Sequence, residues 1–242
     1  MKAKIAILGL ASALSSVAYA GELTLGEMNT GAIIEDKDIL ITPNFEISKI
    51  GLSDKLEVGT FLLGNAGGFI NLGARYGVIQ NDDGMLSVTA WAAYELPWED
   101  DDTGATGGGV PWFWSQVDYT MPHGDNWLTF NAGTGGALGD DGFVVGGSNV
   151  SIYYLMLNGD KGWQFELFAD PYGIAQGMDI EDTVGVSGQW LMAREILRFG
   201  VGLDIMGTDS FIANSLIGDV VAEWDYSLPV IVAPTAYLAF KF

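Results

Sequence analysis

The feature that most restricts the fold of this chain is an alternation of apolar with small or polar residues, repeated in stretches of about ten residues. In one stretch the apolar face consists of Ile70, Leu72, Ala74, Tyr76 and Val78. The opposite face consists of Asn71, Gly73, Arg75 and Gly77. Because successive side chains of a β-strand point to opposite faces, this pattern predicts strands with one apolar and one polar face.

Turns rich in Gly, Asn and Asp separate these stretches, and the pattern predicts an all-β, antiparallel chain of about twelve strands, with ten to fourteen allowed. The predicted strands cover 38–48, 55–63, 68–79, 85–96, 111–121, 127–137, 143–157, 162–170, 184–193, 196–206, 216–226 and 229–242. Counted back from Phe242, this set places the long segments 97–110 and 171–183 at the same end as the termini. Membrane barrels have short turns at that end, so either the strand count is off by one, with the boundary at Ala193–Glu195 the first candidate for the error, or the barrel is unusual.

The first twenty residues predict a secretory signal peptide. Lys2 and Lys4 precede an uncharged apolar stretch, and Ala18 and Ala20 form an A-x-A cleavage site. An uncleaved membrane anchor is the alternative, but the apolar stretch is short for a spanning helix. We therefore expect a signal peptide at 1–20 and one domain at 21–242.

The composition excludes several classes of protein. The formal net charge is −21, yet 49% of the residues are hydrophobic, which argues against a disordered chain. Nucleic-acid binding is not expected because phosphate contacts need a basic surface. The absence of cysteine excludes disulfides and thiolate metal sites.

Two folds fit many alternating strands: a soluble sandwich or barrel with an apolar interior, and a transmembrane barrel with its apolar face toward lipid. The polar face is rich in Gly, Ala, Ser, Thr and Asn, which suits a crowded, narrow lumen. Six tryptophans near predicted strand ends favour an interfacial girdle over ordinary core positions. They are Trp98, Trp112, Trp114, Trp127, Trp163 and Trp224.

The C-terminus carries a resemblance to a known class. Ala236, Leu238, Phe240 and Phe242 share one face of the last predicted strand, and Phe242 ends the chain. This ending resembles the last strand of Gram-negative outer-membrane β-barrels, which the barrel-assembly machinery recognises. The resemblance implies a transmembrane β-barrel in the bacterial outer membrane, with membrane lipid and that machinery as partners. Leu238, Phe240 and Phe242 would then form the assembly signal.

A shorter resemblance lies at Gly51–Gly59, which reads GLSDKLEVG. It is similar to a G-L-T-D-R-L-E-L-G hairpin in outer-membrane proteins described as aromatic-compound or phenol-degradation channels, which are related to transporters of hydrophobic substrates. Ser53 stands where that hairpin has Thr, and Lys55 where it has Arg.

The inward face predicted from the alternation carries nine acids and three bases. It consists of Glu46, Glu57, Arg75, Glu95, Asp118, Glu166, Arg198, Asp204, Asp219, Glu223, Asp225 and Lys241. With too few bases for complete pairing, this set predicts a wet, cation-favouring lumen. The alternative is that the charges pair across a filled lumen.

Metal binding and catalysis are not expected, and no cofactor is predicted. The weak metal candidates Asp100, Asp101 and Asp102 lack the spacing of known Ca²⁺ loops, and solvated turn tips explain such clusters as well. The sole histidine, His123, lies in a predicted turn and lacks a serine two residues later. A protease-like pairing of His123 with Asp118 or Asp125 is the remaining enzymatic hypothesis.

We therefore expect a narrow porin-like channel or binder for small cationic or apolar solutes. The first alternative is a non-conducting structural or adhesive barrel with acidic loops. The second is a barrel hydrolase that uses His123.

Overall fold

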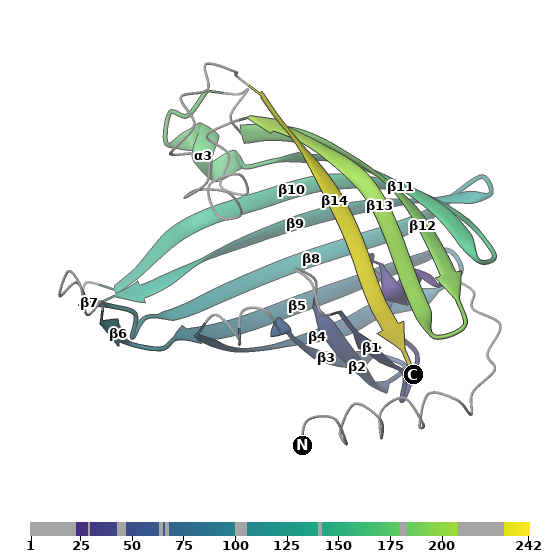
Figure 1. Ribbon diagram of the computed structural model, residues 1–242, viewed down its shortest axis with the longest axis horizontal. Coiled ribbons are helices and arrows are strands. Elements are labelled where there is room, and N and C mark those ends of the chain that lie inside the picture. Colours follow the sequence, from purple (N-terminus) through teal and green to yellow (C-terminus); the bar gives the residue numbers. More distant parts are fainter. Residues whose placement is uncertain are drawn as a thin grey trace, which may run out of the picture.

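The computed structural model describes residues 23–28, 30–42, 47–62, 65, 68–99, 106–139, 142–179, 183–207 and 230–242. Twelve strands of this part form a closed antiparallel barrel in the order β1-β14-β13-β12-β11-β10-β9-β8-β5-β4-β3-β2 (Figure 1). The predicted all-β, antiparallel barrel is thus confirmed. The strands are β1 (Ile39–Ile41), β2 (Ser48–Ser53), β3 (Leu56–Thr60), β4 (Phe69–Asn81), β5 (Gly84–Glu95), β8 (Pro111–His123), β9 (Asn126–Gly139), β10 (Gly142–Asn158), β11 (Lys161–Ala169), β12 (Val184–Arg194), β13 (Leu197–Gly207) and β14 (Val230–Lys241).

Few elements lie outside the barrel wall. A small ribbon pairs β6 (Trp98–Glu99) with β7 (Thr106–Gly107), and a 3-10 turn, η2, covers Leu25–Glu27. The short helix α3 (Pro171–Ala175) begins at Asp170, whose carboxylate accepts a hydrogen bond from the Tyr172 amide at 3.0 Å. Within the described ranges, no helix is long and apolar enough to cross a membrane.

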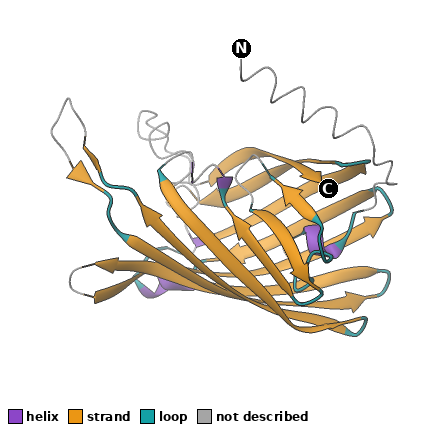
Figure 2. Cartoon of the chain, turned by 90° about the horizontal axis from the view of Figure 1, so that it is seen from below, coloured by secondary structure: helices purple, strands orange, loops and turns teal. Residues whose placement is uncertain are grey.

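The two ends of the barrel differ in their connections. At one end the strands are joined by two-residue turns at 54–55, 82–83, 124–125, 159–160 and 195–196, and Phe242 lies at the same end. We call this the tight-turn end; the short turns gather there in Figure 2. The other end, the long-loop end, carries segments 96–110 and 170–183.

This arrangement agrees with the predicted number of about twelve strands but corrects which segments form them. β13 pairs directly with β14, so the long segments 97–110 and 171–183 lie opposite Phe242 and not beside it. The predicted strand 216–226 lies outside the described residues. The predicted strand 38–48 is wrong, because β1 ends at Ile41 and β2, which begins at Ser48, runs back antiparallel to it. Pro43 and Asn44 supply the reason, since proline and asparagine favour turns over the interior of a strand. Each of the ten other predicted strands overlaps one observed strand.

The alternation places the apolar residues on the outside of the wall. We call this surface the outer belt; its exposed members include Ile70, Leu72, Val88, Val117, Phe130, Ile152, Trp163, Phe165, Leu167, Val186, Val201, Leu203 and Val232. The buried side chains of the strands are largely polar or charged. A soluble barrel has the opposite arrangement, because water favours polar surfaces and apolar cores.

The tight-turn end of the lumen is filled by residues 23–38, which we call the plug. The plug donates backbone hydrogen bonds to opposite parts of the wall. The Gly31 amide reaches Thr120 Oγ1 at 2.8 Å on β8, and the Leu23 amide reaches the carbonyl of Gly159 at 3.0 Å in the β10–β11 turn. Leu23, Met28 and Ile34 are buried with lumen side chains of β10, β12 and β14. The lumen is therefore occupied across its width at this end.

A β-bulge helps to seat the plug. The β4–β5 register shifts between Gly77 and Ile79, so both Val78 and Ile79 face outward. Gln80 consequently faces the lumen, where its amide nitrogen donates to the Gly31 carbonyl at 2.7 Å. Its amide oxygen accepts from the Ile33 amide at 3.1 Å.

Substituting Gly31→Ala should destabilise the plug. A Cβ at Gly31 would lie 2.1 Å from the Met85 carbonyl oxygen, so backbone must move. We expect a loss of about 1–3 kcal/mol, typical of overpacking, in the free energy of unfolding measured by denaturant titration. The control is Gly139→Ala, where a Cβ meets nothing within 4 Å. Equal stability of the two variants would contradict the seating described here.

Candidate functional site

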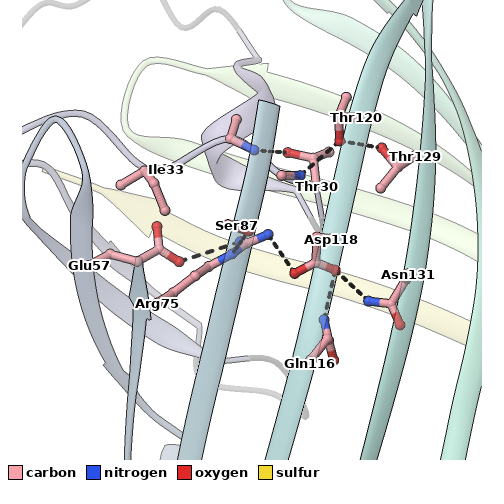
Figure 3. Close-up of polar contacts among 12 residues, drawn as sticks. Thr30, Ile33, Glu57, Arg75, Ser87, Gln116, Asp118, Thr120, Thr129 and Asn131 are labelled. Atoms are coloured by element: carbon pink, nitrogen blue, oxygen red, sulfur yellow. Dashed lines mark hydrogen bonds and ion pairs between the residues drawn. The ribbon is translucent and has the colours of Figure 1, made fainter. Parts of the chain in front are cut away.

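Charged residues meet on the lumen side of β3, β4 and β8. Arg75 lies between Glu57 and Asp118, with Nη1 3.5 Å from Glu57 Oε1 and Nη2 3.0 Å from Asp118 Oδ2 (Figure 3). Arg75 Nε also donates to Ser87 Oγ at 2.8 Å. Lys49 Nζ lies 4.0 Å from Glu57 Oε1. We call Lys49, Glu57, Arg75 and Asp118 the Arg75 cluster.

Neutral polar groups complete the hydrogen bonding of Asp118, which is fully buried. Its Oδ1 accepts from the amide nitrogens of Gln116, at 2.9 Å, and of Asn131 (Figure 3). Two residues further along β8, on the side of the plug, the Thr120 hydroxyl lies 2.7 Å from the Thr129 hydroxyl of β9. A buried carboxylate is costly unless it is paired and hydrogen-bonded, and Asp118 meets both conditions.

A second cluster ties the plug to the end of the barrel. Glu27 lies in η2 and forms two ion pairs. Its Oε2 is 2.6 Å from Arg198 Nε, and its Oε1 is 3.0 Å from Lys241 Nζ. Lys241 Nζ also lies 2.9 Å from Asp38 Oδ2. We call Glu27, Asp38, Arg198 and Lys241 the Glu27 cluster. It joins the plug to β13 and β14.

Each cluster contains two acids and two bases. The charges of the two clusters are therefore balanced, whereas the predicted excess of acids over the whole lumen is not tested, because four of those acids lie outside the described residues. Many of the remaining acids lie exposed in turns. Among them are Asp36, Asp54, Asp82, Asp83, Asp125, Asp160 and Glu195.

A cavity of about 670 Å³ lies next to the plug and the two clusters, on their side toward the long-loop end. Glu27, Lys49, Glu57 and Arg75 contribute its charged part. Its aromatic part comes from four side chains, namely Phe61, Trp91, Trp114 and Tyr237. Small-molecule sites commonly enclose about 300–1,000 Å³ and combine apolar walls with a few polar groups. The cavity has that size and that composition.

Glycines make room for the two tryptophans. Trp91 and Trp114 are direct cross-strand partners on β5 and β8. A Cβ on Gly73 would lie 1.8 Å from the Trp91 ring, and one on Gly133 would lie 2.7 Å from the Trp114 ring. The glycines of the inward face therefore allow broad indole rings to lie flat against a narrow wall.

This geometry corrects part of the expected tryptophan girdle. Trp114 lines the cavity and Trp127 packs against the buried lumen cluster, so neither lies on the outer belt. Trp112 occupies an inward position by the same alternation as Trp114. Trp163 faces outward and stacks on Phe165, as expected. The side chain of Trp98 and the whole of Trp224 lie outside the described part.

The structure brings together only part of the predicted lumen set. Arg75 and Asp118 belong to one cluster, and Arg198 and Lys241 to the other. Glu95, Glu166 and Asp204 occupy inward positions of β5, β11 and β13 closer to the long-loop end, in neither cluster. Glu46, Asp219, Glu223 and Asp225 lie outside the described residues, as do Ala18, Ala20, Asp100, Asp101 and Asp102.

The C-terminal pattern has the expected alternation. Tyr237 and Ala239 are buried on the lumen side, whereas Leu238 and Phe240 lie on the other face and Phe242 is exposed. The Gly51–Gly59 segment forms the β2–β3 hairpin around the turn at 54–55. Its Glu57 is a member of the Arg75 cluster.

His123 lies at the tight-turn end of β8, exposed, with its ring packed edge-on against Tyr154 at 6.1 Å between centroids. Asp118 is five residues away on an unbroken strand, so the two side chains point to opposite faces. The hypothetical His123–Asp118 pair is therefore wrong. Within the described ranges, no group of three or more His, Asp or Glu residues is arranged to hold a metal ion.

Comparison with known proteins gives no relative. No family model matches the chain, and neither curated proteins nor solved structures yield a match.

Several site residues were not anticipated from the sequence. The sequence analysis did not single out Lys49, which lies just beyond the incorrectly predicted strand 38–48. Glu27 and Asp38 precede β1, the first observed strand. The only sequence signal for the plug is that the apolar residues Ala32, Ile33 and Ile34 stand before the first strand without alternating.

Replacing Glu27 with Gln should leave Arg198 and Lys241 without their shared carboxylate. Breaking a buried ion pair costs about 3–5 kcal/mol, which we expect as a loss in the free energy of unfolding. The control is Asp36→Asn, which removes an exposed pair with Lys37 at 3.8 Å and should cost less than about 1 kcal/mol. A Glu27→Gln loss as small as that of the control would contradict the anchoring role of Glu27.

Proposed function

We propose that this chain is an outer-membrane β-barrel that binds one small solute in its lumen and is not an open pore. The observation that carries the proposal is the cavity of about 670 Å³ closed beneath by the plug. The outer belt supports membrane placement, because a wall whose apolar side chains face outward is stable in hydrocarbon and not in water. The short turns at one end and long segments at the other agree with this class.

The chemistry of the cavity favours a solute with an apolar ring and a polar end. The ring would lie against Trp91 and Trp114, where offset or edge contacts between aromatic groups are favourable. The polar end would face the Arg75 cluster. Because both clusters are balanced in charge, they give no net preference for a cation, and binding would rest on hydrogen bonds and apolar contact.

The plug distinguishes this function from passive conduction. It contacts β3, β4, β8, β13 and β14 through side chains or backbone, so displacing it requires breaking both clusters or their hydrogen bonds. A barrel whose described residues are obstructed in this way is suited to binding a solute at rest more than to steady conduction.

The binding proposal is tested with an uncharged aromatic dye, phenylnaphthylamine, titrated into the refolded mature chain in lipid vesicles. We expect saturable binding that Trp114→Ala weakens about tenfold, or 1.4 kcal/mol. The control Trp163→Ala, which changes an outward tryptophan, should bind as the unaltered chain does. Equal affinities in the two variants, or no saturable binding, would contradict the cavity as the binding site.

Single-channel recording in a planar bilayer tests the closed lumen. The unaltered chain should show no steady openings, because the plug lies across the lumen. Discrete, long-lived openings with the plug intact would favour the porin-like alternative.

A further inference from the structure

A second hollow lies on the outer surface of the barrel, away from the lumen cavity. It has a volume of about 890 Å³ and spans β10 to β13, which stand side by side in the wall (Figure 1). At its centre is Gly188 on β12, whose direct partners are Phe165 on β11 and Leu203 on β13. We call this hollow the outer groove.

The outer groove exists because Gly188 has no side chain. This position faces outward, since both of its partners, Phe165 and Leu203, are exposed members of the outer belt. A Cβ on Gly188 would lie 3.5 Å from the Phe165 ring, an ordinary van der Waals contact, so a larger residue would fit there. Apolar rows close the two ends, namely Trp163, Trp190 and Val201 toward the tight-turn end and Leu167, Val186 and Ile205 toward the long-loop end.

The shape and lining of the outer groove suit a hydrocarbon chain. The rings of Trp163 and Phe165 stack with 3° between their planes and 6.1 Å between their centroids, and they form the side of the groove on β11. From Trp190 to Val186 the groove follows four residues of β12, which is about 13 Å. An acyl chain that fills this hollow gains dispersion contacts that a void would lose.

Two bases lie at the tight-turn end of the outer groove. Lys161 and Arg194 continue the outward rows of Trp163 on β11 and of Trp190 on β12, and both are exposed. Lys161 is opposite Met192, so Arg194 is its diagonal neighbour, at about 7–8 Å. Neither base forms an ion pair with a described residue. Tryptophan is typical of the membrane interface, so the bases lie at the depth where lipid head groups begin.

Two acids lie one residue further toward the water. Asp160 precedes Lys161 in the β10–β11 turn, and Glu195 follows Arg194 in the β12–β13 turn. Both acids are exposed. The order from the membrane outward is therefore apolar groove, bases and acids. A phospholipid with a zwitterionic head group has the complementary order, which is acyl chain, phosphate and ammonium.

From this complementary order we infer that the outer groove binds one phospholipid whose head group carries a phosphate and a primary ammonium, as in phosphatidylethanolamine. One acyl chain lies over Gly188, the phosphate meets the two bases, and the ammonium meets the two acids. The inference rests on the membrane placement in the proposed function and does not depend on solute binding in the lumen. An anionic head group is the weaker ligand, because it would meet the acids with a charge of the same sign.

Native mass spectrometry tests the lipid selectivity. The refolded mature chain, in micelles of a neutral detergent, receives equal amounts of phosphatidylethanolamine, phosphatidylcholine and phosphatidylglycerol with the same acyl chains. We expect one phosphatidylethanolamine to be retained about fivefold more than either other lipid, because choline has no N–H to donate and phosphatidylglycerol has no ammonium. Equal retention, or a preference for either other lipid, would overturn the inference.

Paired substitutions test the head-group contacts. The double variant Lys161→Gln, Arg194→Gln should lower the retention of phosphatidylethanolamine about fivefold, and Asp160→Asn, Glu195→Gln should remove its advantage over phosphatidylglycerol. The control is Lys55→Gln, which removes an exposed base in the β2–β3 turn at the same end of the barrel, away from the groove. Retention that is the same in the double variants and in the control would contradict the proposed contacts.

Filling the groove tests the acyl chain. Gly188→Leu should lower the retention of phosphatidylethanolamine about fivefold, whereas Val117→Leu, on the outward face of β8, should leave it unchanged. A competitor gives a measurement on the unaltered chain. Glycerophosphoethanolamine, which has the same head group and no acyl chains, should not displace the lipid at equal concentration. Displacement would show that the head group alone is bound, and would overturn the role of the groove.

Flotation with lipid vesicles separates this inference from the proposed function. A refolded chain that does not float with the vesicles would overturn membrane placement and the lipid site together. A chain that floats and binds the dye, but retains the three lipids equally, would overturn the lipid site alone. Selective retention of phosphatidylethanolamine without saturable dye binding would overturn solute binding in the lumen and support the lipid site.

Discussion

The structure depends on one constraint: the polar side chains of this barrel must be satisfied inside it, because its outer face is apolar. A charge in a narrow lumen has few water molecules to solvate it, so it needs a partner of opposite sign at short range. Arg75 and Arg198 meet this need in the same way, each lying against acidic groups from other parts of the chain. The clusters they form hold the wall and the plug in a single arrangement.

The same constraint explains why the plug belongs to the fold and is not an appendage. Glu27 sits in the 3-10 turn, where it is nearly fully buried, and its two cationic partners come from β13 and β14. Without Glu27, those cations would lie close together on two adjacent strands without their shared carboxylate. The plug therefore contributes a charged side chain to the lumen as well as volume. The cavity is lined by Glu27 on the side of the plug and by aromatic side chains along the barrel wall.

The sequence predicted the wall well and the interior poorly. Period-two alternation depends on neighbours along the strand, so Ile70 to Val78 and Leu238 to Phe242 were assigned to the right faces. The clusters depend on contacts between residues far apart in the chain, such as Glu27 with Arg198, and no local pattern encodes them. Glycine was also ambiguous: Gly73 and Gly133 suited a narrow lumen, but nothing in their spacing showed that Trp91 and Trp114 lie over them. The predicted strand 38–48 is wrong because apolar residues stand on both sides of Pro43, so the local pattern hides the break between β1 and β2.

The Glu27 cluster has a consequence for the order in which the molecule assembles. Glu27 and Asp38 precede or begin the wall, whereas Lys241 is the next-to-last residue. Contacts of such sequence separation form slowly, because closing a long stretch of chain costs conformational entropy before the contact is gained. The cluster that seats the plug is therefore complete only when β14 has joined β1. A chain that lacks the last few residues of β14 would lose two things together. One is the β1–β14 pairing that closes the barrel, and the other is the contact of Lys241 with Glu27 and Asp38 that holds the plug.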